Sequence, residues 1–266
     1  MIIRKATLHG GKHRQLGINN QDACDTQTFE VPAYGKTYSV GLVSDGCTGI
    51  PAVSRSEVGS NLLVTYALGR IQQLICGGSK LEDIPRVLYS FAAEFLKNLS
   101  ALVIPEGMHW PYPAQFKGDQ AFRNSLSAMG RFRTDYLSAT LIGFITDGET
   151  LVTFSAGDGV ILVNDDLNVI EQNDRPDYIS QSINRPSAGF VTRTYVANDV
   201  HRLVISTDGL KDLFSEPQFR LDLFDTSRTP RAILVECFER APEKMTDDCT
   251  VICLNNAKGS DITPCS

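Results

Sequence analysis

The chain has 266 residues, of which 42% are hydrophobic and 21% are charged, and its formal net charge is −6. This composition is typical of a soluble globular protein with one large domain. The negative charge argues against a nucleic-acid-binding protein, which normally carries a basic face. The chain has neither a run of roughly 18 apolar residues nor an N-terminal apolar signal segment. We therefore expect no membrane span and a location in the cytoplasm.

The seven cysteines are scattered along the chain and form no CxxC pair. Their number is odd, and their spacing fits neither a disulfide framework nor a zinc site. We interpret them as buried or incidental thiols of a protein in a reducing compartment.

The first half of the chain predicts one buried strand followed by two helices. Residues 38–44 form an apolar run that ends at Asp45. Apolar residues then keep helical spacing from about 54 to 76 and again from about 81 to 99. We expect these helices to form an antiparallel pair that covers one face of a sheet. Prolines and glycines break the pattern between about 102 and 134, which predicts an irregular insertion within a single domain spanning 1–266.

The second half of the chain is predicted to consist mainly of strands. Apolar runs predict strands at 139–145, 150–156, 160–164, 202–207 and 250–254, and a helix is expected at 230–240. Asp147-Gly148 and Gly157-Asp158-Gly159 indicate hairpin turns between the first three strands. Residues 168–197 are predicted to form a long loop or flap. Because helices and strands are grouped and do not alternate strictly, we predict a layered α+β fold.

Five aspartates lie at or near the edges of these strands: Asp22, Asp45, Asp135, Asp208 and Asp247. A single Asp-Gly pair at a strand end is most often only a turn. Here two apolar strands end in Asp-Gly, at Asp45 and Asp208, and a third begins just after Asp247-Asp248. Several carboxylates brought together repel one another unless cations lie among them, and hard oxygen ligands favour Mg²⁺ or Mn²⁺. A water molecule between two such ions is a nucleophile suited to attack a phosphate ester.

These residues belong to an ordered set of six short motifs: Asn20-Gln21-Asp22-Ala23, Ser44-Asp45-Gly46, Ser138-Ala139-Thr140, Gly157-Asp158-Gly159, Ser206-Thr207-Asp208-Gly209-Leu210 and Asp247-Asp248-Cys249-Thr250. In this order they resemble the metal-dependent protein phosphatases of type 2C. The stretch from Gly11-Lys12-His13-Arg14 to Gly17 resembles a divergent bacterial branch of that family, in which a histidine precedes the Asn-Gln-Asp segment. The resemblance implies an α-β-β-α sandwich of four layers, with two antiparallel sheets flanked by helix pairs.

The resemblance also implies a metal site with two Mg²⁺ or Mn²⁺ ions and a third, weaker one. Asp45 would bridge the two ions, the Gly46 carbonyl would be a further ligand, and Asp208 and Asp247 would hold one ion. Asp22 would act directly or through water, and Asp135 would bind the third ion. Asp158 would support the sheet turn without touching the metal.

The chain departs from the family pattern near its N-terminus. The family usually has an arginine that binds the substrate phosphate at the position of Gly17, and an Asp-Asn pair at the position of Asp247-Asp248. We hypothesise that His13 or Arg14 contacts the phosphate or protonates the leaving group instead. The alternative is that His13 is incidental, as a lone histidine often is.

Three functions follow from this sequence. The first is a phosphatase that acts on phosphoserine or phosphothreonine in a partner protein, expected to be linked to a kinase, with the phosphatase itself a monomer. The second is a pseudophosphatase, a regulatory module that binds phosphorylated partners without turnover, which the missing arginine favours. The third is a phosphatase of a small phosphorylated molecule.

Overall fold

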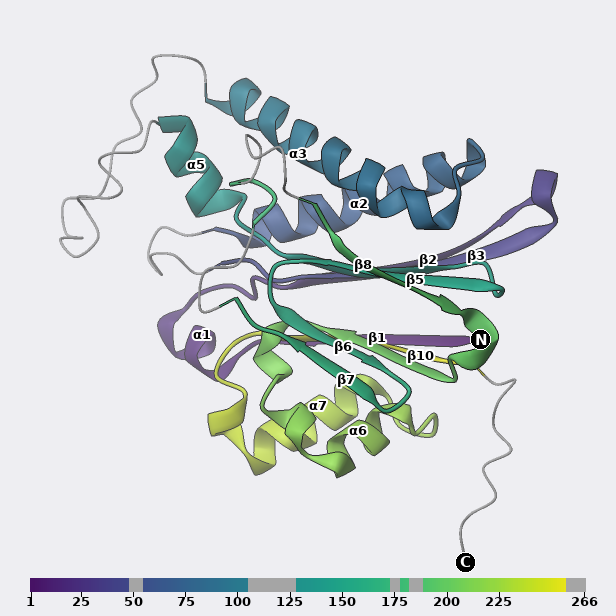
Figure 1. The fold of residues 1–266 in the computed structure, drawn as a ribbon. Coiled ribbons are helices and arrows are strands. Elements are labelled where there is room, and N and C mark those ends of the chain that lie inside the picture. The colour runs from purple at the N-terminus through teal and green to yellow at the C-terminus, as the bar shows by residue number, and fades with distance from the viewer. Residues whose placement is uncertain (48–54, 105–127, 173–177, 182–188, 257–266) are drawn as a thin grey trace, which may run out of the picture.

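The protein is a sandwich of four layers, with a helical layer outside each of two stacked sheets (Figure 1). The computed structural model describes residues 1–47, 55–104, 128–172, 178–181 and 189–256. The predicted α+β architecture, with two antiparallel sheets flanked by helices, is confirmed. No helix in these ranges is long and apolar enough to cross a membrane.

The first sheet joins strands from the two ends of the chain. Its five strands are, in spatial order, β1 (Ile2–Leu8), β10 (Cys249–Asn255), β9 (Arg202–Ser206), β6 (Gly159–Val163) and β7 (Asp166–Ile170). All neighbouring pairs are antiparallel. Because β10 lies between β1 and β9, the last described strand is an interior strand of this sheet.

The second sheet is formed by five strands that lie between residues 23 and 196. Its strands are β2 (Ala23–Val31), β3 (Lys36–Ser44), β4 (Leu141–Thr146), β5 (Thr150–Ala156) and β8 (Val191–Val196). These pairs are also all antiparallel. The expected hairpin at Asp147-Gly148 is confirmed, because β4 and β5 are neighbours.

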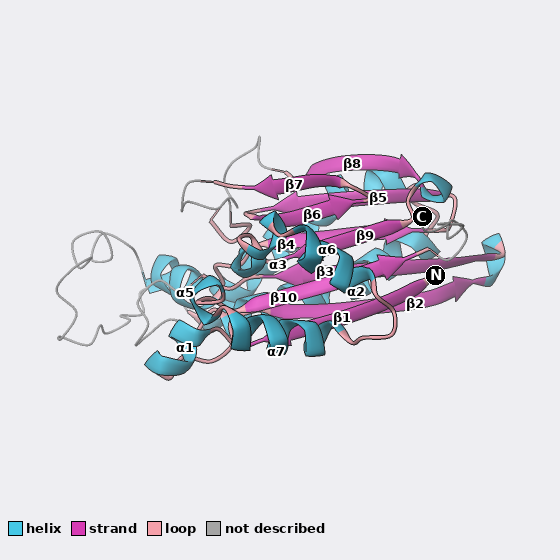
Figure 2. Cartoon of the chain, turned by 90° about the horizontal axis from the view of Figure 1, so that it is seen from below, coloured by secondary structure: helices cyan, strands magenta, loops and turns pink. Residues whose placement is uncertain are grey.

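Helices cover the outer face of each sheet. The predicted antiparallel pair, α2 (Glu57–Cys76) and α3 (Ile84–Val103), packs on the second sheet, and α6 (Pro217–Phe224) and α7 (Pro230–Arg240) pack on the first (Figures 1 and 2). α3 turns Leu88, Ala92 and Leu96 inward at four-residue spacing, which explains why this amphipathic segment folds as a helix on the sheet. The short α1 (Gly11–Leu16) lies at one end of the sandwich.

Besides the apolar side chains between each sheet and its helices, a further cluster of apolar side chains lies between the two sheets. It includes Val43, Ile142 and Phe144 from the second sheet and Ile205 and Ile252 from the first, all fully buried. These side chains alternate along their strands with others that face the helices, so each strand contributes to two cores. The two sheets therefore pack as rigid plates, and loops at their ends are held at fixed positions relative to one another.

The predicted hairpin at Gly157-Asp158-Gly159 is wrong. β5 belongs to the second sheet and β6 to the first, so this turn carries the chain from one sheet to the other. Gly157 and Gly159 have φ of +97° and +148°, values that favour glycine. A Cβ on Gly159 would lie 2.4 Å from the Ile142 side chain and 2.6 Å from the Ser206 carbonyl oxygen. The two glycines thus allow a tight crossing that places Asp158 at the junction of the sheets.

Two segments expected to be irregular contain regular structure. The end of the expected insertion at 102–134 forms α5 (Ala128–Tyr136), while residues 105–127 lie outside the described part of the chain. The expected loop at 168–197 overlaps β7 at one end and contains β8 at the other. Strands β1 and β2 and helices α1 and α6 were not predicted.

Candidate metal centre

Acidic side chains from both sheets meet at one end of the sandwich. This is the end where α1 lies (Figure 1). Strand register explains this meeting. Ala23 pairs with Ser44, so Asp22 and Asp45 flank the same end of the second sheet. Ser206 pairs with Val251, so Asp208 and the Asp247-Asp248 pair lie at one end of the first sheet. Antiparallel pairing therefore brings together carboxylates from opposite ends of the sequence.

The possible metal ligands of the described residues form two groups of three. One consists of Asp45, Asp158 and Asp208, and the other of His13, Asp247 and Asp248. Within each group the candidate ligand atoms all lie within 4.8 Å of one another. The groups are electrostatic neighbours, since the charge of Asp247 acts on both Asp45 and Asp208.

The Ser138-Ala139-Thr140 motif holds Asp45 in place. The Asp45 N–H donates to the Thr140 hydroxyl at 3.0 Å, and the Thr140 N–H donates to the Asp45 carbonyl at 2.8 Å. Gly46 forms a β-bridge with Ala139, and a Cβ on Gly46 would lie 2.7 Å from the Gln21 carbonyl oxygen. The Asp-Gly pair therefore needs glycine because the backbones approach closely at this point.

Asp22 links the two sheets through a buried threonine. The Thr207 hydroxyl donates to Asp22 Oδ2 at 2.8 Å and accepts the Thr250 N–H at 3.0 Å. Asp22 is only 6% exposed, so the protein alone shields its carboxylate from solvent.

Burial and mutual repulsion raise the pKa of the central carboxylates. Burial, reinforced by the charge of Asp248, raises the pKa of Asp22 to about 7. Burial and the charges of Asp158 and Asp247 raise the pKa of Asp208 to about 6. Burial and the neighbouring aspartates also hold the pKa of Asp45 well above its ordinary value. Divalent cations would remove this repulsion, so the donor set fits the hard, oxygen-binding ions expected from the sequence.

Asp158 lies with the candidate ligands and not apart from them. The sequence predicted that it would only support the turn, yet its carboxylate belongs to the same group as those of Asp45 and Asp208. Asp135 is also buried, near the end of α5, but it falls in neither of the two groups. Its assignment to a third ion remains a prediction.

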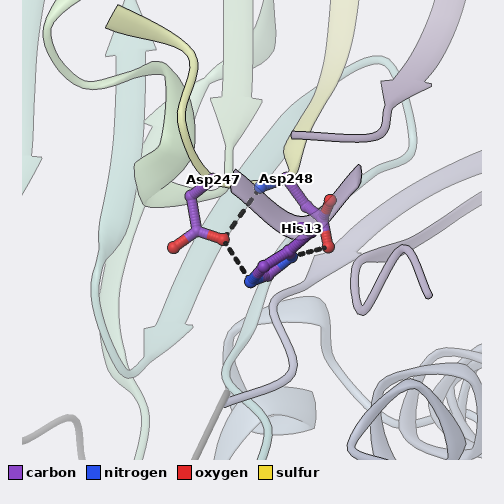
Figure 3. A group of neighbouring side chains, drawn as sticks. All are labelled: His13, Asp247 and Asp248. Atoms are coloured by element: carbon purple, nitrogen blue, oxygen red, sulfur yellow. Dashed lines mark hydrogen bonds and ion pairs between the residues drawn. The ribbon is translucent and has the colours of Figure 1, made fainter. Parts of the chain in front are cut away.

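The two residues proposed for phosphate contact have different surroundings. His13 is 3% exposed and lies between Asp247 and Asp248 (Figure 3). Burial lowers the pKa of His13, but the hydrogen bond to Asp248 and the charges of Asp247, Asp248 and Asp22 outweigh burial and raise it overall. Arg14 is exposed and its guanidinium stacks on the Phe238 ring of α7, 4.7 Å from the ring centre. Gly17, where the family arginine would be, ends α1 with φ of +66°.

Two residues at this site were not singled out from the sequence. Asp248 was noted as part of the Asp247-Asp248 pair and as a departure from the family pattern but was given no role, whereas its buried carboxylate joins three segments of the chain. Tyr178, from the expected flap, is buried near Cys47, and burial together with Cys47 and the charges of Asp45 and Asp158 raises its pKa. The doubled aspartate at a strand start was a usable signal for Asp248, whereas nothing in the sequence marks Tyr178.

Comparison with models of known protein families identifies the family of this chain. The family model described as protein phosphatase 2C matches residues 9–234. The chain belongs to the protein phosphatase 2C family. A search of curated protein sequences gave no significant match.

Solved structures of bacterial phosphatases have the same fold as this chain. A bacterial serine phosphatase, solved as a point mutant, has a TM-score of 0.62 and 13% identity, with 96% of this chain and 98% of that chain covered. Stp1 from Staphylococcus aureus, a serine/threonine phosphatase, has a TM-score of 0.57 and 13% identity, with 96% and 94% covered. The catalytic domain of the serine/threonine phosphatase PstP, solved with two manganese ions, has a TM-score of 0.56 and 16% identity, with 95% and 97% covered.

Proposed function

We propose that this protein is a metal-dependent phosphatase that hydrolyses phosphoserine and phosphothreonine in partner proteins. The observation that carries the proposal is the convergence of Asp45, Asp158 and Asp208 with Asp22 and Asp247 at one end of the sandwich. Such a cluster is electrostatically unfavourable by itself and suited to two Mg²⁺ or Mn²⁺ ions. Two bound ions supply a water nucleophile near neutral pH and neutralise charge on the phosphate.

The protein residues contribute position and charge to this reaction. Asp45, Asp208 and Asp247 would hold the ions, and Asp22 would act through its place beside Asp45. Before substrate binds, the hydrogen bonds of Thr140 fix the backbone of Asp45 and that of Thr207 fixes the carboxylate of Asp22. A preorganised site of this kind needs little rearrangement during catalysis. Asp247, with a side chain 53% exposed, lies where the cluster opens to solvent, so a phosphate group would approach from that side.

A pseudophosphatase is the second candidate. Gly17 supports it, because this position forms the left-handed end of α1 and carries no side chain to bind a phosphate. In that case the protein would bind phosphorylated partners without hydrolysing them.

For the phosphatase we also propose a signalling role, a kinase-linked partner, a monomeric state and a location in the cytoplasm.

Hydrolysis of p-nitrophenyl phosphate in Mn²⁺, Mg²⁺ or EDTA tests the proposal. We expect turnover that requires metal and falls at least about 100-fold in Asp208→Asn, since changing even the partners of metal ligands costs about 10–100-fold. Asp212→Asn is the matched control, because Asp212 is exposed and belongs to neither ligand group. Metal-independent turnover, or no turnover in folded protein with either ion, would contradict the proposal.

The leaving group is tested separately. Turnover of phosphoserine and phosphothreonine peptides, compared with small phosphate esters at equal concentration, distinguishes a protein phosphatase from a small-molecule phosphatase. We expect kcat/KM to be higher for the peptides. Tight peptide binding without turnover would instead support the pseudophosphatase.

A further inference from the structure

His13 lies between two carboxylates that have different roles (Figure 3). Its Nδ1 is 2.8 Å from Asp248 Oδ2, and its Nε2 is 3.4 Å from Asp247 Oδ1. The Asp248 side chain is 1% exposed, whereas that of Asp247 is 53% exposed. The imidazole therefore presents one nitrogen to a buried carboxylate and the other to the carboxylate at the open side of the metal centre.

Asp248 determines which nitrogen of His13 carries the proton. The Gly10 N–H donates to Asp248 Oδ1 at 2.8 Å, and the Gln21 N–H donates to Oδ2 at 2.6 Å. Because both oxygens of Asp248 already accept backbone N–H groups, we assign His13 Nδ1–H as the donor of the 2.8 Å contact. The Nε2 lone pair of the neutral ring then faces Asp247.

The backbone around this pair is tightly fixed. A Cβ on Gly10 would lie 2.2 Å from the Asp247 carbonyl carbon, and a Cβ on Gly209 would lie 1.9 Å from the Asp248 carbonyl oxygen. The Asp247-Asp248 segment is therefore held between two glycine backbones. This geometry keeps the imidazole, Asp247 and Asp248 in place without help from a bound ion.

This arrangement matches that of a metal-binding histidine. Such a histidine almost always donates its other ring N–H to a carboxylate, which fixes its orientation and raises its basicity. Nitrogen and oxygen ligands at about 2.0–2.2 Å from one ion lie about 2.8–3.6 Å apart for octahedral to tetrahedral angles. The 3.4 Å between His13 Nε2 and Asp247 Oδ1 lies within that range.

We propose that His13 Nε2 binds, together with Asp247, one of the ions of the centre, and that Asp248 positions the imidazole for it. This inference rests on the proposed function, since it adds a nitrogen ligand to the same metal centre. The site then has mixed nitrogen and oxygen ligands. Imidazole suits transition metals, whereas Mg²⁺ takes oxygen ligands, so this ion site is selective for Mn²⁺ over Mg²⁺.

Electron spin echo envelope modulation of the Mn²⁺-loaded protein tests the proposal directly, because it detects a ¹⁴N nucleus bound to Mn²⁺. We expect ¹⁴N modulation in the wild-type protein and in the matched control His201→Gln, and its loss in His13→Gln. His201 is exposed and belongs to neither ligand group. Mn²⁺ titration by calorimetry should show at least about a tenfold loss of affinity at one site in His13→Gln, with Mg²⁺ affinity nearly unchanged.

Asp248→Asn tests the positioning role by the same measurements. We expect Mn²⁺ affinity to fall about 10–100-fold, the usual effect of changing the partner of a metal-bound histidine. A purely structural Asp248 would lower the melting temperature and leave the affinity of the folded protein unchanged.

The outcomes separate this inference from the proposed function. If Mn²⁺ binds and supports turnover but the wild-type protein shows no ¹⁴N modulation, the inference is wrong and the phosphatase stands. Persistence of the modulation in His13→Gln also overturns it. If the wild-type protein binds no Mn²⁺, both the inference and the metal-dependent phosphatase are wrong.

Discussion

Replacement of Gly10 is the most direct test of how tightly the two glycine backbones hold the Asp247-Asp248 segment. Gly10 has φ of −65° and ψ of 152°, a conformation open to any residue, so the cost of a side chain is purely steric. Gly10→Ala places a methyl group against the Asp247 backbone. We expect a loss of about 1–3 kcal/mol in the free energy of unfolding, as for other overpacked sites. Urea denaturation measures it, and Mn²⁺ affinity should fall as well.

Gly69→Ala provides the control for Gly10→Ala. Gly69 lies on the exposed face of α2, and a Cβ there would have no neighbour within 4 Å. The substitution removes backbone freedom in a helix and should stabilise the protein by about 0.5–1 kcal/mol. Opposite signs for the two variants are the expected result. A neutral Gly10→Ala would show that the Asp247-Asp248 segment adjusts freely.

At this scale most of the candidate ligands could be named from the sequence, but not how they are held. Asp45 and Asp208 could be recognised because each follows an apolar strand and precedes glycine. The contribution of Asp158 depends on which sheets its neighbouring strands join, and a local pattern contains no such information. His13 could be named as a candidate, whereas its two carboxylate partners became visible only in three dimensions.

Among the elements, the β4–β5 hairpin is expected to contribute less to stability at low pH. Asp147 accepts the N–H groups of Glu149 and Thr150 and pairs with Lys36 at 2.8 Å. Burial would raise the pKa of Asp147, but Lys36 and the two N–H groups lower it overall. The stabilisation from its ionised form is therefore complete above the ordinary aspartate pKa of about 3.9 and is lost as pH falls through the lowered pKa.

Asp147→Asn should therefore lower the free energy of unfolding by about 1 kcal/mol at pH 7. The difference from wild type should shrink as the pH falls below about 4. Denaturant titrations at several pH values measure both effects. Glu149→Gln is the matched control, because Glu149 pairs with the same lysine at 2.7 Å but is exposed, and we expect less than about 0.5 kcal/mol there. An equal loss in both variants would assign the effect to Lys36 and not to the turn.

Prediction of the elements succeeded where a segment was clearly apolar, along one face for a helix or along its whole length for a central strand. The helices on the second sheet and most central strands fall in this class. The turn at Gly157-Asp158-Gly159 shows the limit, because glycines signal a change of direction without stating which sheet receives the next strand. β8 was missed because its side chains are largely exposed, and β1 because only Ala6 and Leu8 of its seven residues are buried, as edge strands permit.

For the whole molecule, metal binding should stabilise the fold, because the candidate ligands come from both sheets. Any ion that binds only the folded state adds about 2.7 kcal/mol at 100 times its Kd. For a chain of this size that corresponds to a rise in Tm of about 5–11 °C. Differential scanning fluorimetry in EDTA and in Mn²⁺ measures the rise. It should disappear in Asp208→Asn and remain in Asp212→Asn, and an unchanged wild-type Tm would argue against ions that join the two sheets.

The pairing of β10 with both β1 and β9 has a consequence for synthesis of the protein. A nascent chain that has emerged only as far as β9 lacks Asp247 and Asp248, and it leaves the edges of β1 and β9 without their shared neighbour. The ribosome must therefore deliver nearly the entire described chain before the first sheet can close. A partly synthesised chain cannot assemble the proposed metal centre, so the proposed activity arises in a single step when the last strand inserts.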